Sequence, residues 1–282
     1  DEDARADRSP GEFYQLDMEM AFASQEDVFA VIEDVLPPVF AKYGIYKEAS
    51  KAPFARISYR DALEKYGSDK PDLRIDLVLQ DATEVLADCG FGPFDGQCVE
   101  AIVVDQFTAT RKVIDKICAD VEVQSGQKAY WFKLDENGEL VGGIAKFLQE
   151  RKEAVIEKLG LKKGDFVGLT AGKKGDALKG AGVLRKYLGM NSEAHMKQNC
   201  YEFCWIVDFP MYEIGEESGE LEFCHNPFSM PQGGMDALCN ADPLSINAYQ
   251  YDLVCNGVEL SSGAVRNHDP EIMVKAFEIV GL

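Results

Sequence analysis

The stretch "AYQYDLVCNGVELSSGAVR", residues 248–266, carries side chains with a clear capacity for chemistry. Asn256-Gly257 between alternating apolar residues predicts a hairpin with a two-residue type I′ turn. Pairing outward from this turn puts the carboxylates of Asp252 and Glu259 on one face of the hairpin. Two such carboxylates repel each other unless a cation lies between them, and a divalent metal that escorts a polyphosphate would supply that charge. The competing interpretation is a solvent-facing acidic pair, which is common in a chain this acidic.

Arg266 follows the same hairpin but has the opposite parity from Glu259, so a regular strand would point it away from the carboxylates. Counting from the turn places Asp252 opposite Ser261. The "SSG" run predicts a β-bulge at residues 261–263, because a glycine inside a strand pattern often marks one. The bulge would bring Arg266 onto the carboxylate face, where its guanidinium suits bidentate recognition of a small carboxylate. Taken alone, an arginine here is more often a surface charge.

The stretch "YQLDMEMAF", residues 14–22, alternates in the same way. Its apolar residues fall on one parity, and Gln15, Asp17 and Glu19 fall on the other. This pattern predicts a strand with an apolar face and an acidic, hydrogen-bonding face. Considered by itself, the strand favours a polar face that simply meets water.

His225 stands in "EFCHNPFSMPQGG", between a strand signal and a run of prolines and glycines that predicts a loop over the sheet. A lone histidine is more often structural than functional, and only the residues around it favour a functional role here. The eight cysteines form no CxxC pair, which argues against a zinc site and favours a reduced, cytoplasmic protein.

The elements that must position these residues follow from the pattern along the chain. Ser24 predicts a helix start, and "LPPVF" predicts that this helix ends or kinks at its prolines. A short helix closes at Gly67. Residues 75–195 alternate strand-like runs and amphipathic helices, which predicts a self-contained α+β unit inserted between two parts of one sheet. The expected division is therefore 1–74, 75–195 and 196–282.

The bulk properties are those of an ordinary soluble globular protein, with 46% hydrophobic and 28% charged residues among 282. No apolar run reaches the length of a membrane span, which predicts a protein without membrane insertion. The net charge of −20 argues against indiscriminate binding of nucleic acid, but it leaves room for a local patch that docks one folded RNA.

Five stretches stand out when taken together: "DEDARADRSPGEFYQLDMEM", "YGSDKPDLR", "WIVDFPMYE", "HNPFSMP" and "YDLVCNGVELSSGAVRNH". In this order they resemble one family, the class II aminoacyl-tRNA synthetases in the form of bacterial-type aspartyl-tRNA synthetases. The first stretch is similar to motif 2 of that family. The resemblance implies an α+β fold, in which part of the family's antiparallel sheet with flanking helices is interrupted by an inserted α+β domain called GAD.

The resemblance also implies roles at the ATP end of the site. Asp1 and Glu2 would bind ATP near the adenine, and Ser9 stands in the motif 2 loop where many relatives have a glutamine. Asp252 and Glu259 would hold Mg²⁺ and the ATP phosphates.

At the other end of the site, Gln15, Asp17 and Glu19 would line the aspartate pocket, with Asp17 on the substrate ammonium. Arg266 would bind the substrate side-chain carboxylate, and His225 would close over the amino acid. The implied reaction is attack of the aspartate carboxylate on the ATP α-phosphorus, followed by transfer to tRNA. Catalysis would consist mainly of positioning and charge stabilisation.

The family's motif 1, motif 3, anticodon-binding domain and the motif 2 arginine that would precede Asp1 are not found in this sequence. We therefore expect a fragment that is inactive alone, from an enzyme that is a homodimer at full length. The expected partners are L-aspartate and tRNA(Asp), and charging of tRNA(Asn) stays open. The alternative is a non-catalytic synthetase-like module that binds tRNA or another partner. Convergence of Asp17, Asp252, Glu259 and Arg266 on one face would argue against this alternative.

Overall fold

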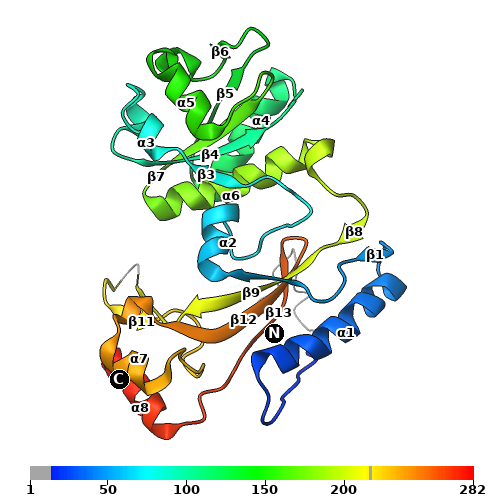
Figure 1. The fold of residues 1–282 in the computed structure, drawn as a ribbon, viewed down its shortest axis with the longest axis vertical. Coiled ribbons are helices and arrows are strands. Elements are labelled where there is room, and N and C mark those ends of the chain that lie inside the picture. The colour runs from blue at the N-terminus through cyan, green and yellow to red at the C-terminus, as the bar shows by residue number, and fades with distance from the viewer. Residues whose placement is uncertain (1–13, 216–217) are drawn as a thin grey trace.

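The computed structural model describes residues 14–215 and 218–282, which form two lobes arranged end to end (Figure 1). The first lobe contains a four-stranded sheet in the order β13-β12-β9-β2. Strand β12 is antiparallel to both of its neighbours, whereas β2 runs parallel to β9. The strands are β2 (Ala55–Ser58), β9 (Phe203–Pro210), β12 (Asn247–Cys255) and β13 (Val258–Ala264). One sheet is thus assembled from segments almost 150 residues apart in the chain.

The second lobe, here called the middle unit, runs from β3 to α6 and has its own five-stranded antiparallel sheet in the order β3-β4-β7-β5-β6. Its strands are β3 (Leu79–Asp81), β4 (Cys98–Val104), β5 (Ala129–Leu134), β6 (Leu140–Val141) and β7 (Phe166–Gly172). Its helices are α3 (Thr83–Leu86), α4 (Arg111–Ser125), α5 (Lys152–Leu159) and α6 (Lys174–Met190). Separate hydrophobic clusters fill the two faces of this sheet, so the unit has a core of its own.

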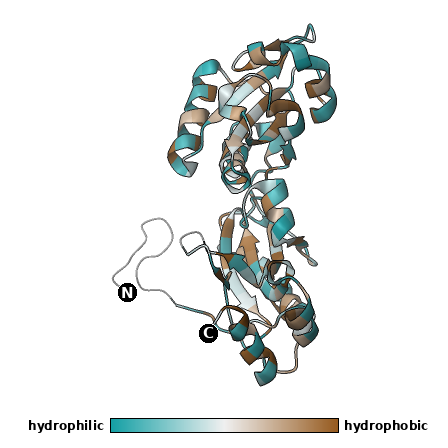
Figure 2. Cartoon of the chain, turned by 90° about the vertical axis from the view of Figure 1, so that its left-hand side faces the viewer, coloured by the Kyte–Doolittle hydropathy of each residue, from teal (hydrophilic) through white to brown (hydrophobic). Residues whose placement is uncertain are grey.

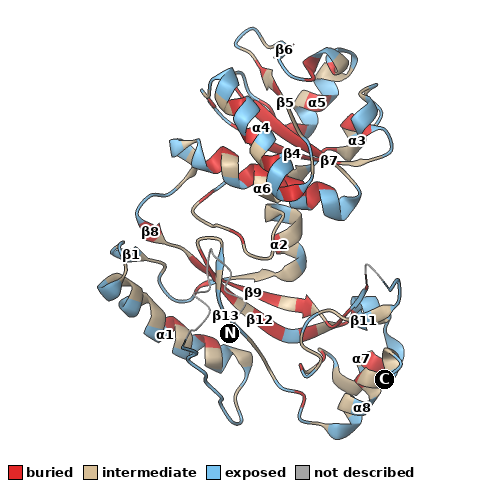
Figure 3. Ribbon diagram, turned by 180° about the vertical axis from the view of Figure 1, so that it is seen from behind, coloured by how far each residue is buried: buried red, intermediate tan, exposed pale blue. Residues whose placement is uncertain are grey.

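Helices cover both faces of the four-stranded sheet. Alternate residues of a strand point to opposite faces, so Tyr251 and Leu253 of β12 pack with Phe29 of α1 (Gln25–Tyr43), whereas Val254 packs with Ala62 of α2 (Tyr59–Tyr66). The central strands β9 and β12 are mostly buried (Figure 3). Hydrophobic residues likewise gather on the strands of each lobe (Figure 2). Val254, and with it Asp252 two residues earlier, therefore lies on the α2 face of the sheet.

Shorter elements complete the structure. They are β1 (Glu48–Ala49), β8 (Cys200–Tyr201), β10 (Tyr212–Ile214), β11 (Leu221–Phe223), α7 (Gly234–Asn240), α8 (Pro270–Ile279) and the 3₁₀ turns Gly92–Phe94, Ala145–Phe147, Gln149–Arg151, Glu193–His195 and Pro243–Ser245. Strand β1 pairs in parallel with β8, and an isolated bridge between Ile75 and Met196 joins the two chain crossings between the lobes. No helix among the described residues is long and apolar enough to cross a membrane.

The α+β fold class with helix-flanked antiparallel sheets is confirmed, and so are two of the helix boundaries. Ser24 caps α1 in a capping box with Asp27, and Gly67 ends α2 with a left-handed φ of 66°. Both signals act over three or four residues, so they do not depend on the rest of the fold.

The predicted end or kink at "LPPVF" is wrong in one respect, because α1 continues through Pro37 and Pro38 to Tyr43. Each proline removes one helical donor, which leaves the carbonyls of Glu33 and Asp34 without their usual partners. The second half of the helix is held by packing instead: the Phe40 ring contacts the rings of Tyr201 and Phe203, with centroids 4.9 and 5.1 Å away.

The predicted strand at residues 14–22 is also wrong: residues 14–20 have no regular structure and are exposed, and Ala21 and Phe22 form a turn. A strand needs a neighbour to satisfy its backbone groups, and no strand among the described residues pairs with this segment. Gln15, Asp17 and Glu19 are therefore not arranged on the face of a sheet.

Candidate functional site

The hairpin between β12 and β13 forms as the sequence predicts. Asn256 and Gly257 both have positive φ, 52° and 81°, as a type I′ turn requires. Val254 lies opposite Glu259 in the ladder. The Asn256 side chain adds support, because its Oδ1 accepts from the Glu202 amide at 2.9 Å.

The bulge in β13 exists, but it falls one residue earlier than predicted. Leu253 pairs with Ser261 while Val254 pairs with Glu259, so Leu260 is the extra residue. Asp252 consequently lies opposite Ser262, not Ser261. Asp252 shares a face with Val254, and therefore with Glu259, as expected.

The carboxylates of Asp252 and Glu259 meet the loop after α2, which brings Asp69 and Lys70. The Lys70 ammonium lies 3.3 Å from a Glu259 carboxylate oxygen and 2.8 Å from Asp69. We call these four residues the acidic site. Burial, and then the charge of Glu259, raise the pKa of Asp252 to about 7, while Lys70 opposes this shift. Three carboxylates around one ammonium leave the site short of positive charge.

This deficit fits a divalent cation that arrives with a polyphosphate. In residues 14–215 and 218–282, no three His, Cys, Asp or Glu side chains are grouped so that they could hold a metal ion by themselves. Two carboxylates on one face are instead suited to a Mg²⁺ ion whose other ligands are phosphate oxygens and water. Lys70 is not predicted as a site residue, because "GSDKPD" by itself indicates only a turn and a family signature.

His225 lies in the loop after β11, as predicted, and this loop covers the same sheet face as Asp252. Its exposed ring lies 5.1 Å from the ring of Phe209 and 6.1 Å from that of Tyr59, by centroids. The buried amide of Gln250, on the Asp252 face of β12, donates to the Asn226 carbonyl at 2.9 Å and so ties the loop down.

Arg266 regains the parity of Asp252 because of the bulge, and it lies beyond the end of β13 in an isolated bridge with Ser229. It is exposed, and it forms no ion pair with any residue that the structure describes. Burial and then the charge of Glu19 raise the pKa of Tyr251, while the charge of Arg266 lowers it.

The remaining predicted site residues are not brought together. Gln15 and Asp17 are exposed in the segment without regular structure. Asp1, Glu2 and Ser9 lie outside the described residues. Asp252 and Glu259 thus share a face, whereas the convergence of Asp17 with them is not observed.

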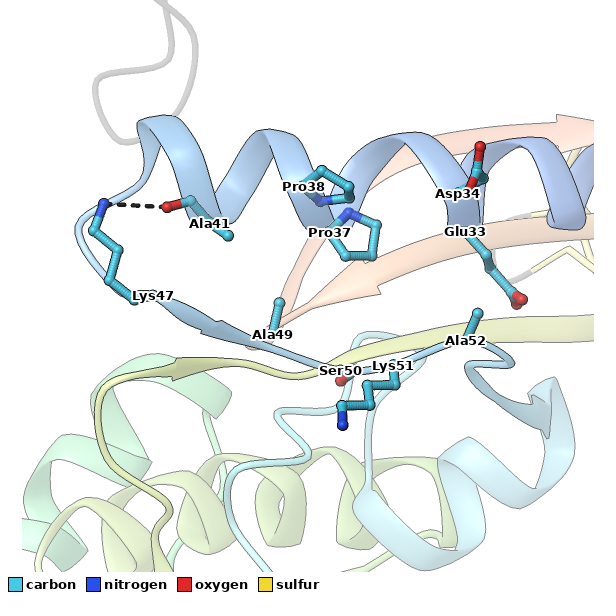
Figure 4. Close-up of a pocket in the computed structure, with 10 residues that line it drawn as sticks. All are labelled: Glu33, Asp34, Pro37, Pro38, Ala41, Lys47, Ala49, Ser50, Lys51 and Ala52. Atoms are coloured by element: carbon cyan, nitrogen blue, oxygen red, sulfur yellow. Dashed lines mark hydrogen bonds between the residues drawn. The ribbon is translucent and has the colours of Figure 1, made fainter.

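A cavity of about 390 Å³ lies elsewhere, between α1 and residues 47–52 (Figure 4). Glu33, Pro37 and Pro38 line it from the helix, and Lys47 closes one end by donating to the Ala41 carbonyl at 3.1 Å. Because α1 packs on the opposite face of the sheet from Asp252, this cavity is separate from the acidic site.

Comparison with known proteins adds an independent line of argument. The family model for tRNA synthetases class II (D, K and N) matches residues 1–282. The chain is 52% identical over its whole length to an aspartate–tRNA ligase of Streptomyces coelicolor, of which it covers 48%. It is 51% identical to an aspartate–tRNA(Asp/Asn) ligase of Zymomonas mobilis, again over 48% of that protein. The chain thus spans about half the length of the curated relatives it matches, and it belongs to the class II tRNA synthetases of the D, K and N group.

Proposed function

We propose that this chain supplies part of the catalytic domain of an aspartate–tRNA ligase, which activates L-aspartate with ATP and transfers it to tRNA. The observation that carries the proposal is the convergence of Asp252, Glu259 and Lys70 on one face of the four-stranded sheet. The printed names of the relatives support the amino acid and the RNA.

At the ATP end, Asp252 and Glu259 would hold Mg²⁺ together with the phosphates. An ion held by these two carboxylates would supply neutralisation of the phosphate charge. Lys70 offsets the repulsion between the carboxylates before nucleotide enters. Asp1, Glu2 and Ser9 would complete the ATP contacts.

At the aspartate end, Arg266 would bind the side-chain carboxylate of the substrate, because a guanidinium matches a carboxylate in two parallel hydrogen bonds. Asp17 would accept from the substrate ammonium, and Gln15 would stand beside it. His225, exposed on its loop over the same face as Asp252, would close over the amino acid.

The proposed domain division is 1–74 and 196–282 for the catalytic part and 75–195 for an inserted GAD-type domain. The complete enzyme would be a cytoplasmic homodimer that acts on tRNA(Asp). Charging of tRNA(Asn) as well is in keeping with the Asp/Asn name of one relative.

Aspartate-dependent ATP–pyrophosphate exchange tests the proposal. It should be measured on this chain and on an extended protein, in which the chain is completed to the length of its relatives. We expect exchange in the extended protein and its loss in Arg266→Ala. The control is Arg111→Ala, which removes an exposed arginine of the middle unit that pairs with Asp115. Absence of exchange in the extended protein would overturn the proposal and favour a synthetase-like module that binds without activating.

A further inference from the structure

Arg185 of α6 is a buried cation, 2% exposed, that the proposed chemistry does not use. Its guanidinium donates to three backbone carbonyls of one irregular segment: Leu77 at 2.6 Å, Asp72 at 3.1 Å and Ile75 at 2.5 Å. It also lies 4.8 Å from the centre of the Tyr66 ring, at the end of α2. A buried guanidinium normally pairs with a carboxylate, so three main-chain carbonyls in its place indicate that its task is to fix a backbone path.

The backbone of α6 touches the start of the same segment. Gly67 and Gly182 approach so closely that a Cβ on Gly182 would overlap the carbonyl oxygen of Gly67. Gly67 also needs its positive φ of 66° to end α2. The segment from residue 67 to residue 77 is therefore held at its start by a glycine contact and at its end by Arg185, both from the middle unit.

Between these two anchors, the segment carries Lys70 to the acidic site. The Lys70 amide donates to Ser68 Oγ at 3.0 Å, and its ammonium reaches Glu259 at 3.3 Å. Asp72 packs against the hairpin turn, where a Cβ on Gly257 would lie 3.4 Å from the Asp72 Cβ. The position of Lys70 thus depends on a loop that touches the hairpin turn but takes its two anchors, Gly182 and Arg185, from outside the four-stranded sheet.

We infer that Arg185 is a positioning residue for the acidic site, which holds Lys70 against Glu259 from the middle unit. The expected effect on ATP binding rests on the proposed function. The effect on the position of Lys70 rests only on the contacts described above. The middle unit is then a support of the nucleotide end of the site, and perturbing α6 changes ATP binding from a distance.

The test is a double-mutant cycle in the extended protein, with KM for ATP measured by pyrophosphate exchange at saturating Mg²⁺. Lys70→Met should raise KM for ATP about tenfold, because it removes a charge-assisted contact at a site that must accept a polyanion. Arg185→Gln should do the same, with a smaller effect on KM for aspartate. In the Lys70→Met background, Arg185→Gln should have little further effect, because both changes remove one interaction.

Two variants guard against a general loss of folding. Arg185→Lys keeps the positive charge and one donor nitrogen, so its KM for ATP should lie between those of the wild type and Arg185→Gln. Arg151→Gln is the matched control, because Arg151 donates to the carbonyls of Val85 and Asp88 elsewhere in the middle unit, at 3.4 and 2.5 Å. It should destabilise that unit without changing KM for ATP. Equal effects of Arg185→Gln in both backgrounds, or an equal effect of Arg151→Gln, would overturn the inference.

Amide hydrogen exchange of the 282-residue chain separates failure of this inference from failure of the proposed function. If the extended protein shows no activity, the inference stands when Arg185→Gln speeds exchange across residues 68–74 and Arg151→Gln does not. The inference is overturned if amide exchange across residues 68–74 is the same in Arg185→Gln and Arg151→Gln.

Discussion

Glu33 is the buried polar centre of the packing between α1 and the four-stranded sheet. It is 7% exposed, and one carboxylate oxygen accepts from the Phe54 amide at 3.1 Å, from Arg56 at 2.8 Å and from the Trp205 indole at 3.0 Å. Arg56 also pairs with Glu26 at 2.8 Å, so it keeps a partner if Glu33 is removed. The amide of Phe54 and the indole of Trp205 have no such alternative among the described hydrogen bonds.

Glu33→Ala should therefore leave two buried donors unsatisfied, at about 1–3 kcal/mol each. The two donors together would cost about 2–6 kcal/mol. Glu33 also lines the cavity beside α1, from which water can reach part of the vacated space, so the total falls in the lower half of this summed range. We expect a loss of about 3 kcal/mol in the free energy of unfolding. Glu33→Gln keeps an acceptor oxygen and loses only the negative charge that pairs with Arg56, so it should cost about 1 kcal/mol.

Urea unfolding followed by Trp205 fluorescence measures these losses for the lobe in question. The chain has two tryptophans, and a Trp131→Phe background leaves Trp205 as the only emitter. Asp34→Ala is the control, because Asp34 is the exposed neighbour of Glu33 on the same helix. A loss below about 1 kcal/mol for Glu33→Ala, or equal losses for the Ala and Gln variants, would refute the reasoning.

Two further predictions concern the middle unit and the hairpin. Burial and the charge of Asp81 raise the pKa of Glu100 from 4.5 to about 7, so the folded state binds this proton more tightly and stability falls as the pH rises between these values. In thermal unfolding, Glu100→Gln should thus be about 3 kcal/mol more stable than the wild type at pH 8 and equal to it at pH 4; a difference independent of pH would contradict this. Asn256→Ala should cost about 2–3 kcal/mol in chemical unfolding, because alanine resists the positive φ and the hydrogen bond from Glu202 is lost. Asn256→Gly should recover about 1 kcal/mol of this loss, because glycine adopts positive φ without strain. Equal costs for both variants would show that the positive φ does not contribute to the loss.

The sequence placed the acidic pair correctly and the acidic site around it incompletely. The two-residue turn fixes the pairing of Val254 with Glu259, so the common face of Asp252 and Glu259 follows from local chemistry. Lys70 could not be found in this way, because no periodicity links it to a residue 189 positions later. Its place depends on a loop held from α6.

The segment 14–22 shows the opposite case, in which a clear local pattern did not determine the structure. Its alternation is compatible with a strand, but alternation specifies only which faces would exist. Whether a strand forms depends on a neighbour that offers hydrogen bonds, and the described residues supply none for Gln15, Asp17 and Glu19. The continuation of α1 through Pro37 and Pro38 is similar, since aromatic packing around Phe40 outweighs two lost hydrogen bonds.

The sequence by itself determined the features that act over a few residues: the caps at Ser24 and Gly67, the turn at Asn256-Gly257 and the presence of a bulge in β13. Each depends on backbone sterics or on a hydrogen bond between near neighbours, which the local residues fully specify. The tertiary structure alone decided the exact bulge position and the approach of Lys70 to Glu259. These depend on packing between distant segments, where small free-energy differences summed over many contacts select one arrangement.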